Sequence, residues 1–217
     1  MTSLILLSAG EGRRFGGKKQ FERLFGKPLF MHSLERLVGL FDEILLVLPP
    51  EDIDRFSLPS SIRKVAGGRE RQDSVFNALL EAEGDVVVIH DCARPFAGAE
   101  LFQRVSQLGE HQGKICAVPI RDTVKRVAQG MVVETVDRSG LWLSQTPQAF
   151  NRRVLLECHF RARRDGFFVT DDAQLLERYG YRVGVVLGEV TNIKITYPED
   201  LLLAESIGKL LGYPGAP

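Results

Sequence analysis

The sequence predicts an α/β fold, in which a Rossmann-like, doubly wound and mostly parallel sheet carries an inserted β-hairpin arm. Three observations lead to this prediction. Short apolar runs of strand length alternate along the chain with segments whose apolar residues have helical spacing. The first run ends in a glycine-rich, cationic loop. After Pro119 the pattern changes to the two-residue alternation that is typical of paired antiparallel strands.

The bulk properties of the chain exclude several classes of protein. The 217 residues fit one large domain, so we expect a single domain over 1–217 with the arm at about 119–140. Because the formal net charge is zero, no general attraction for nucleic acids or membrane surfaces is expected. The apolar runs are too short to cross a bilayer, and the first lacks the cationic start of a signal peptide. Three widely spaced cysteines, Cys92, Cys116 and Cys158, predict reduced thiols and a cytoplasmic location.

The stretch from Leu4 to Phe21 organises the predicted site. Its apolar start, Leu4-Ile5-Leu6-Leu7, indicates a buried parallel strand. Glycines and cations follow, at Gly10, Gly12, Arg13, Arg14, Gly16, Gly17, Lys18 and Lys19. Glycines let backbone N–H groups approach a ligand closely, and clustered cations favour an anion, which together predict a polyphosphate-binding loop. The loop matches neither common phosphate motif, since Lys19 replaces the Ser or Thr of a P-loop and Phe15 the third glycine of a dinucleotide fingerprint.

Strands and helices continue to alternate through the first half of the chain. Helices are expected at 28–38 and 101–108, and strands at 43–48, 62–65, 86–89 and 115–118. A second glycine-led turn, Gly67-Gly68, leads into a helix with Val75, Leu79 and Leu80 on one face. Ligands of such sheets bind beyond the carboxyl ends of the strands. The first loop, the Gly67-Gly68 turn and segment 90–95 should therefore gather at one edge.

A β-hairpin is predicted where the alternation changes. Residues 123–127 and 131–136 alternate apolar and polar, and Gln129-Gly130 forms the turn between them. A lone hairpin is only marginally stable, so we expect it to pack on something else, such as another subunit. Beyond it, Thr146-Pro147-Gln148 is predicted to turn the chain. Segment 141–144 is expected to return the chain to the main body. The remaining elements are expected as helices at 154–162, 173–179 and 200–211 and strands at 182–186 and 193–196.

Motifs spread over nearly the whole chain resemble those of one enzyme family. The loop Ser8-Ala9-Gly10-x-Gly12-x-Arg14, followed by Lys19-Gln20-Phe21, looks like the signature of nucleotidyltransferases that activate sugar and polyol phosphates. The later motifs, in order, are Gly67-Gly68 with Asp73-Ser74-Val75, His90-Asp91-x-Ala93-Arg94-Pro95, Asp122-Thr123, Thr135-Val136-Asp137-Arg138, Leu141-Trp142, Thr146-Pro147-Gln148, Thr170-Asp171-Asp172 and Asn192-Ile193-Lys194. Together they resemble the 2-C-methyl-D-erythritol 4-phosphate cytidylyltransferases of the non-mevalonate isoprenoid pathway.

The resemblance implies a reaction and a set of site residues. An acceptor phosphate oxygen would attack the α-phosphorus of CTP, forming 4-diphosphocytidyl-2-C-methyl-D-erythritol and releasing pyrophosphate. The protein's task is then charge neutralisation and in-line positioning, without a covalent intermediate. The implied catalytic residues are Arg14, Lys19, Arg138 and Lys194. The implied nucleotide contacts are Ala9, Gly10, Gly12, Gly68, Ser74 and Asp91. The implied acceptor contacts are Arg94, Thr123, Arg138, Thr146, Thr170 and Lys194.

The chemistry and the resemblance also imply a metal and a partner. Mg²⁺ or another divalent cation would bridge phosphate oxygens, with Asp91 as its protein contact. The expected small-molecule partners are CTP and a polyol phosphate, with no nucleic acid and no membrane. In the family the arm reaches a second subunit, so the resemblance implies a homodimer whose sites are each built from two chains.

Other readings of the same residues are open at this point. The acceptor could be ribitol 5-phosphate, because the ribitol 5-phosphate cytidylyltransferases share most of these motifs. A non-catalytic nucleotide-binding protein is possible if Arg14 and Lys19 do not contact phosphate. Among single residues, Arg14 could be a surface cation, Asp91 could pair with nearby Arg94, and Lys194 could form a surface ion pair.

Overall fold

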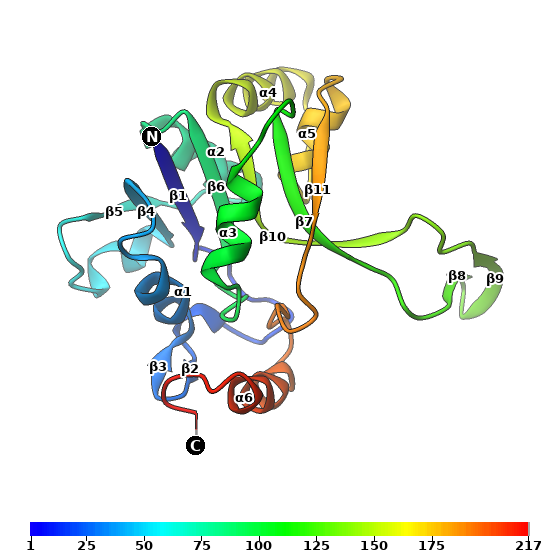
Figure 1. The fold of residues 1–217 in the computed structure, drawn as a ribbon, viewed down its shortest axis with the longest axis horizontal. Helices are drawn as coiled ribbons and strands as arrows, with labels where there is room; N and C mark the ends of the chain where they lie inside the picture. Colours follow the sequence, from blue (N-terminus) through cyan, green and yellow to red (C-terminus); the bar gives the residue numbers. More distant parts are fainter. Residues whose placement is uncertain (217) are drawn as a thin grey trace.

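A seven-stranded sheet with the order β11-β7-β10-β6-β1-β4-β5 forms the centre of the computed structural model, which describes residues 1–216 (Figure 1). Its strands are β1 (Thr2–Leu7), β4 (Glu43–Leu48), β5 (Ile62–Ala66), β6 (Val86–Asp91), β7 (Gly113–Pro119), β10 (Trp142–Asn151) and β11 (Val183–Leu187). Neighbouring strands are parallel except where β10 pairs with β6 and β7. The predicted α/β class, with a mostly parallel sheet, is confirmed.

Helices cover both faces of this sheet. One face packs on α1 (Leu29–Leu37) and α3 (Ala99–Ser106), and the other on α2 (Arg71–Glu81), α4 (Arg152–Asp165) and α5 (Asp172–Arg178). The last helix, α6 (Asp200–Leu210), lies below the carboxyl ends of the central strands (Figure 1). The short elements are η1 (Lys19–Phe21), β2 (Arg23–Leu24), β3 (Lys27–Pro28) and η2 (Pro50–Arg55).

Burial on both faces explains why the central strands have continuous apolar sequences. In β1, Leu4 and Leu6 join the cluster under α1 and α3, whereas Ile5 and Leu7 join the cluster under α2, α4 and α5. Successive side chains of a strand point to opposite faces, so a strand between two helical layers needs apolar residues at every position.

The strand order creates a switch point beside β1. From β1 the chain first builds β4 and β5 on one side, and then crosses back to place β6 on the other. In open α/β sheets, ligands bind outside the carboxyl ends of the strands at such a point. Here the two strands end at Leu7 and Asp91, which are partners in the ladder. The glycine loop and the segment after β6 therefore begin side by side.

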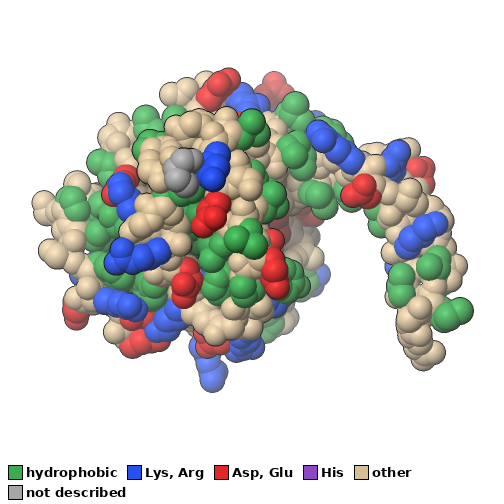
Figure 2. Space-filling model, turned by 90° about the horizontal axis from the view of Figure 1, so that it is seen from below, with side chains coloured by type: hydrophobic (Ala, Val, Ile, Leu, Met, Phe, Trp, Pro, Cys, Tyr) green, Lys and Arg blue, Asp and Glu red, His purple; other side chains and the backbone are tan. Residues whose placement is uncertain are grey.

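The predicted hairpin arm is also present. Strands β8 (Val124–Ala128) and β9 (Met131–Val136) pair with each other in a separate two-stranded sheet, which projects far from the body (Figures 1 and 2). Gln129 and Gly130 at its tip both have positive φ, at 50° and 77°, as a tight hairpin turn requires. Four of its apolar side chains are 57–72% exposed, at Val127, Met131, Val132 and Val133.

Three details of the prediction are wrong. Leu80 is exposed, because the fifth position after Val75 lies off the buried face of α2, where Ala78 packs instead. Thr146-Pro147-Gln148 does not turn the chain; β10 runs through it, with a register shift between Gln145 and Gln148 that marks a β-bulge. Segment 193–196 is no strand: Ile195 N–H donates to the Ala93 carbonyl at 2.9 Å, and no ladder continues from that bond.

Candidate active site

A cleft of about 420 Å³ opens at the switch point. Its walls come from the loop after β1, the turn after β5 and the end of β6, together with a segment of the chain that precedes α6. Among the predicted site residues, the lining includes Ala9, Gly10, Gly12, Lys19, Gly68, Ser74, Asp91 and Lys194. Segments from distant parts of the sequence thus meet where the strand order predicts a ligand.

Gly12 shapes the first wall of the cleft. Its φ is +65°, and a Cβ at this position would lie 1.8 Å from the Gly17 carbonyl oxygen. The Gly12 carbonyl accepts the N–H groups of Phe15 at 2.8 Å and Gly16 at 3.0 Å, which closes the loop on itself. In the described chain the N–H groups of Ala9 and Gly10 donate to no protein acceptor, so they are available to a ligand.

The Gly67-Gly68 turn lies directly against this loop. A Cβ on Gly67 would approach the Ala9 Cβ to 2.4 Å, and one on Gly68 would approach the Asp73 Cβ to 2.2 Å. Ser74 accepts the Gly68 N–H at 3.0 Å through its hydroxyl oxygen. Only glycines permit this close approach, and Ser74 acts on the turn by fixing the Gly68 backbone.

The two adjacent lysines of the loop have different surroundings. Lys18 forms ion pairs with Asp52 and, at 2.7 Å, with Glu51. Lys19 points inward, where its Nζ donates to the Ile195 carbonyl at 2.6 Å. Burial, with the nearby Lys194 charge, lowers the pKa of Lys19. A cation that is held among other cations in a partly buried cleft favours the arrival of a polyanion.

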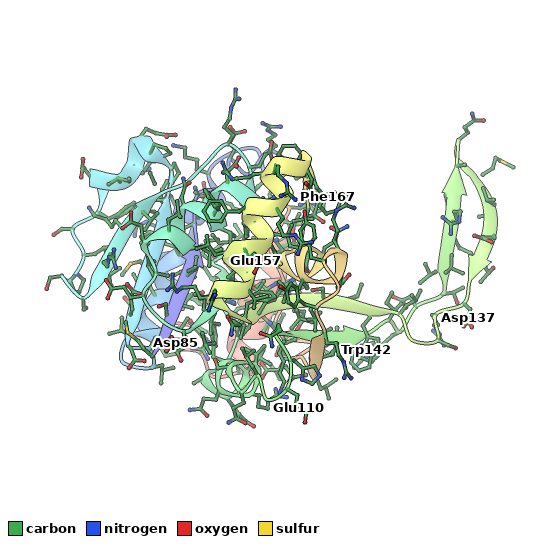
Figure 3. All side chains as sticks on the ribbon, turned by 90° about the horizontal axis from the view of Figure 1, so that it is seen from above. Asp85, Glu110, Asp137, Trp142, Glu157 and Phe167 are labelled. Carbon is green, nitrogen blue, oxygen red and sulfur yellow. The ribbon has the colours of Figure 1, made fainter. Side chains whose placement is uncertain are left out.

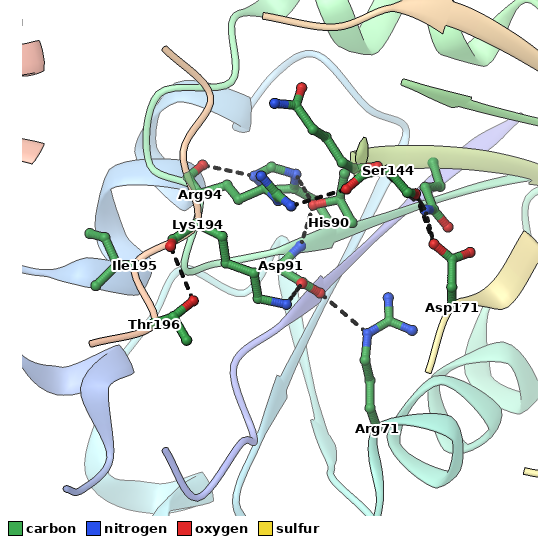
Figure 4. A network of polar contacts seen from close by, with 12 residues as sticks. Arg71, His90, Asp91, Arg94, Ser144, Asp171, Lys194, Ile195 and Thr196 are labelled. Carbon is green, nitrogen blue, oxygen red and sulfur yellow. Dashed lines mark hydrogen bonds and ion pairs between the residues drawn. The ribbon is translucent and has the colours of Figure 1, made fainter. Parts of the chain in front are cut away.

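Asp91 is the centre of a charged network at the floor of the cleft (Figure 4). Its Oδ2 accepts from Lys194 Nζ at 2.5 Å, and its Oδ1 lies 3.4 Å from Arg71 Nε. Burial alone would raise the pKa of Asp91, but the charges of Lys194 and Arg71 outweigh burial and hold it below its usual value. The carboxylate is therefore ionised, and its close partners are Lys194 and Arg71, with Arg94 further away.

Thr146 fixes the backbone of Asp91 from behind. Its hydroxyl oxygen accepts the Asp91 N–H at 3.0 Å and lies 3.0 Å from His90 Nδ1. Burial lowers the pKa of His90 to about 4, so the ring is neutral at physiological pH. Because His90 Nε2 contacts the Arg94 carbonyl, which can only accept, Nε2 carries the ring proton. The Thr146 hydroxyl must therefore donate to Nδ1.

Replacing Thr146 with valine tests this arrangement. The change keeps the shape but leaves the buried Asp91 N–H and His90 Nδ1 without their partner. We expect the free energy of unfolding to fall by about 1–3 kcal/mol, measured by urea denaturation. Ser106→Ala is the control, since that hydroxyl only donates to a carbonyl of its own helix, Phe102, and should cost less than ~0.5 kcal/mol. Equal losses in both variants would contradict the role of Thr146.

Besides Thr146, five predicted residues do not line the cleft of this chain. Arg14 is exposed on the loop, although its charge is close enough to help lower the pKa of Lys19. Arg94 reaches the Asn192 carbonyl at 2.7 Å and the Ser144 carbonyl at 3.4 Å, and so joins two segments beside the cleft. Thr170 is exposed at the start of the turn before α5. Thr123 and Arg138 are exposed at the base of the arm. Asp137, which precedes Arg138 in the sequence, lies outside the body in Figure 3.

Sequence reasoning missed one residue of the floor. Arg71 bonds both Asp91 and Asp172, and it also lines the cleft. Its signal in the sequence is a cation in the first turn of a helix, where the macrodipole disfavours positive charge.

A metal would find few protein ligands here. Within residues 1–216, no group of three or more His, Cys, Asp or Glu side chains is arranged to hold an ion. Asp91 offers carboxylate oxygens in the cleft, which fits an ion carried mainly by substrate phosphates and water.

Of the helices in residues 1–216, none has the length and apolar character that a membrane span needs.

The fold and the site together define a nucleotidyltransferase: a glycine loop at the switch point of a doubly wound sheet, with lysines directed into one cleft. The sequence profile of the IspD family, 2-C-methyl-D-erythritol 4-phosphate cytidylyltransferase, matches residues 2–209, and the chain belongs to this family.

Known relatives of this chain match it over nearly its full length. It is 57% identical to 2-C-methyl-D-erythritol 4-phosphate cytidylyltransferase of Aquifex aeolicus over 212 residues, which cover 98% of each chain. The enzyme of the same name from Bacillus mycoides is 43% identical, with coverage of 95% and 97%. The crystal structure of the enzyme from Thermus thermophilus superposes with a TM-score of 0.83 at 34% identity, covering 94% of this chain and 98% of that one.

Proposed function

We propose that the chain transfers the cytidylyl group of CTP to 2-C-methyl-D-erythritol 4-phosphate, which yields 4-diphosphocytidyl-2-C-methyl-D-erythritol and pyrophosphate. One observation carries the proposal: in a member of this family, the glycine loop, Lys19 and Lys194 meet in a single cleft at the switch point. The free N–H groups of Ala9 and Gly10 and the two lysines offer donors and positive charge to two anionic substrates at once.

The nucleotide would occupy the side of the cleft formed by the loop and the Gly67-Gly68 turn. Backbone groups of Ala9, Gly10 and Gly68 would contact the base and ribose, with Ser74 holding Gly68 in place. Lys19 and Arg14 would neutralise the α-phosphate as negative charge develops on it. Arg14 is free to do so, because it is exposed and lies near Lys19.

The acceptor phosphate would bind on the opposite side, at Lys194. In the structure Lys194 forms an ion pair with Asp91. The arriving phosphate would therefore replace the Asp91 carboxylate as the partner of Lys194. Arg138 and Thr123 would contact the acceptor from an arm. Thr170 and Arg94 would contact it from the rim of the cleft. Thr146 would act through Asp91, since its hydroxyl is already bonded twice. An acceptor phosphate oxygen then attacks the α-phosphorus in line with the departing pyrophosphate.

Mg²⁺ or another divalent cation is part of the proposal. Asp91 would be its protein contact, and the remaining positions would be filled by phosphate oxygens and water. When bound, such an ion supplies charge neutralisation between phosphate oxygens.

We further propose that two chains assemble through the arm. The sheet and both helical layers are complete without it, yet Val127 on β8 and Met131, Val132 and Val133 on β9 are exposed. The identical arm of a second chain would bury these side chains in a symmetric, isologous contact. The same assembly would bring Thr123 and Arg138 of one chain to the active site of the other chain. Three free, buried cysteines fit a cytoplasmic enzyme.

The proposed function is tested by pyrophosphate release from CTP, UTP, ATP and GTP, each with 2-C-methyl-D-erythritol 4-phosphate or ribitol 5-phosphate. We expect release with CTP and the first acceptor, at the highest kcat/KM of the panel. A clear preference for ribitol 5-phosphate would overturn the acceptor assignment. Tight CTP binding without pyrophosphate release from any pair would indicate a binding protein.

The lowered pKa of Lys19 makes a prediction about alkaline pH. Protonated Lys19 binds phosphate, so kcat/KM for CTP should fall as pH rises through this lowered pKa. In Lys194→Met one cause of the lowering is gone, the pKa of Lys19 rises, and the alkaline limb should move to higher pH. Lys18→Met is the control, because Lys18 faces Glu51 and Asp52. An alkaline limb that stays in place in Lys194→Met would contradict this assignment.

A further inference from the structure

We infer that Arg71 is a positioning residue that shares the charge of Asp91, so that Lys194 can be released to the acceptor phosphate. The inference rests on the proposed function, because it assumes that Lys194 binds the acceptor. It assigns a role to a residue pair, Arg71 and Asp172, that lies partly behind the cleft.

The two oxygens of Asp91 face different cations. Oδ2 is 2.5 Å from Lys194 Nζ, and Oδ1 is 3.4 Å from Arg71 Nε (Figure 4). Lys194 stands on the segment before α6 with 36% of its side chain exposed, so it can move to a ligand. Arg71 approaches from α2 on the other side of the carboxylate.

Asp172 holds Arg71 in this position. Arg71 Nη1 donates to Asp172 Oδ2 at 2.6 Å, and the Asp172 side chain is completely buried. Burial would lower the pKa of Arg71, but the charges of Asp172 and Asp91 outweigh burial and raise it, so the guanidinium is always charged. Burial raises the pKa of Asp172 and the Arg71 charge opposes that rise. The 2.6 Å bond to the buried Asp172 oxygen fixes the position of the Arg71 guanidinium.

Within residues 1–216, no other cation competes for Asp172. His159 Nε2 lies 3.8 Å from Asp172 Oδ1, but burial lowers the pKa of His159 to about 3, so the ring is neutral. The Asp172 charge is therefore directed to Arg71. It also offsets the unfavourable position of Arg71 in the first turn of α2, where the helix macrodipole repels cations.

The consequence concerns the exchange at Lys194. With Arg71 in place, Asp91 divides its charge between two cations, and it keeps a fixed partner when Lys194 leaves. Without Arg71, Lys194 becomes the only closely bonded protein cation of a largely buried carboxylate. The acceptor phosphate would then have to break a stronger Lys194–Asp91 pair before it could bind.

The test is the double variant Arg71→Met with Asp172→Asn. Removing both charges avoids a lone buried charge, so the chain should fold. We expect KM for the acceptor to rise about tenfold, whereas KM for CTP should change less than about twofold. The second variant, Arg71→Lys, keeps Asp172 paired but cannot bond both carboxylates at once, so it should show the same rise.

The control is the pair Arg63→Met with Glu43→Gln. Arg63 Nη1 lies 2.6 Å from Glu43 Oε1 at the amino end of β4, away from the cleft. This double variant should have a lower free energy of unfolding, with no change in KM for the acceptor or for CTP. With an active wild-type chain, an unchanged acceptor KM in both Arg71 variants, or an equal rise in both KM values, would overturn this inference alone. A wild-type chain that cannot transfer the cytidylyl group would overturn the proposed function and this inference together.

Discussion

Replacing Lys19 with alanine is expected to lower kcat for cytidylyl transfer by ~100-fold or more, which is typical of losing one preorganised transition-state donor. Lys19 is the cation of the glycine loop that points into the cleft, and burial holds it against the Ile195 carbonyl. The α-phosphate is already anionic in bound CTP, but negative charge on its oxygens increases as the new bond forms, so the loss should appear in kcat more than in CTP binding. Steady-state pyrophosphate release, with CTP affinity measured by calorimetry, separates the two effects.

Lys18→Ala is the matched control for this experiment. It removes the same charge from the adjacent residue of the cleft lining, but Lys18 is ion-paired with Glu51 and Asp52. We expect its kcat to remain within about threefold of the wild-type value, since surface ion pairs contribute little. Near-wild-type turnover in Lys19→Ala, or equal losses in the two variants, would remove Lys19 from the catalytic set.

Mixing two inactive variants is expected to restore activity if the arm completes the neighbouring site. Lys19→Ala lacks the loop cation and Arg138→Ala lacks the arm cation, so each homodimer has two defective sites. In a heterodimer, one site combines the intact loop of one chain with the intact arm of the other. Random exchange of subunits should then restore about a quarter of the wild-type activity, because half of the dimers have one intact site.

The same experiment has two informative failures. If Arg138 serves the site of its own chain, every site in the mixture is defective and no activity returns. If the wild-type chain sediments as an active monomer at the assay concentration, the arm has another role. A mixture of Lys19→Ala with Lys194→Ala is the control, since both residues line one cleft of one chain, and it should remain inactive.

The fold was predictable because its signals are local. Strands buried on both faces have unbroken apolar sequences, such as 44–48, and glycine turns follow β1 and β5 at the ligand edge. The alternation in the arm and the Gln129-Gly130 turn are equally local, and the structure places both as expected. The prediction failed at Thr146-Pro147-Gln148, where a proline that usually turns the chain lies inside a bulged strand.

The candidate site was only partly predictable from the sequence. The glycine loop can be identified because its residues are contiguous, and the order of the strands brings it to Asp91. The partner of Arg71 could not be found in this way, because Asp172 lies 101 positions further along the chain. The resemblance selects Lys19 rather than Lys18, and the physical difference between them comes from η2, whose Glu51 and Asp52 form ion pairs with Lys18. Thr123 and Arg138 are exposed on or beside the arm, outside the cleft of their own chain.

Isotope transfer tests the central claim most directly. The acceptor 2-C-methyl-D-erythritol 4-phosphate is prepared with ¹⁸O in its phosphate group and incubated with CTP and the wild-type chain. The products are then separated, and their masses are measured by mass spectrometry. If an acceptor phosphate oxygen attacks the α-phosphorus, all of the label is found in the diphosphocytidyl product, and the pyrophosphate is unlabelled. Label in pyrophosphate, or release of CMP with unchanged acceptor, would contradict the account.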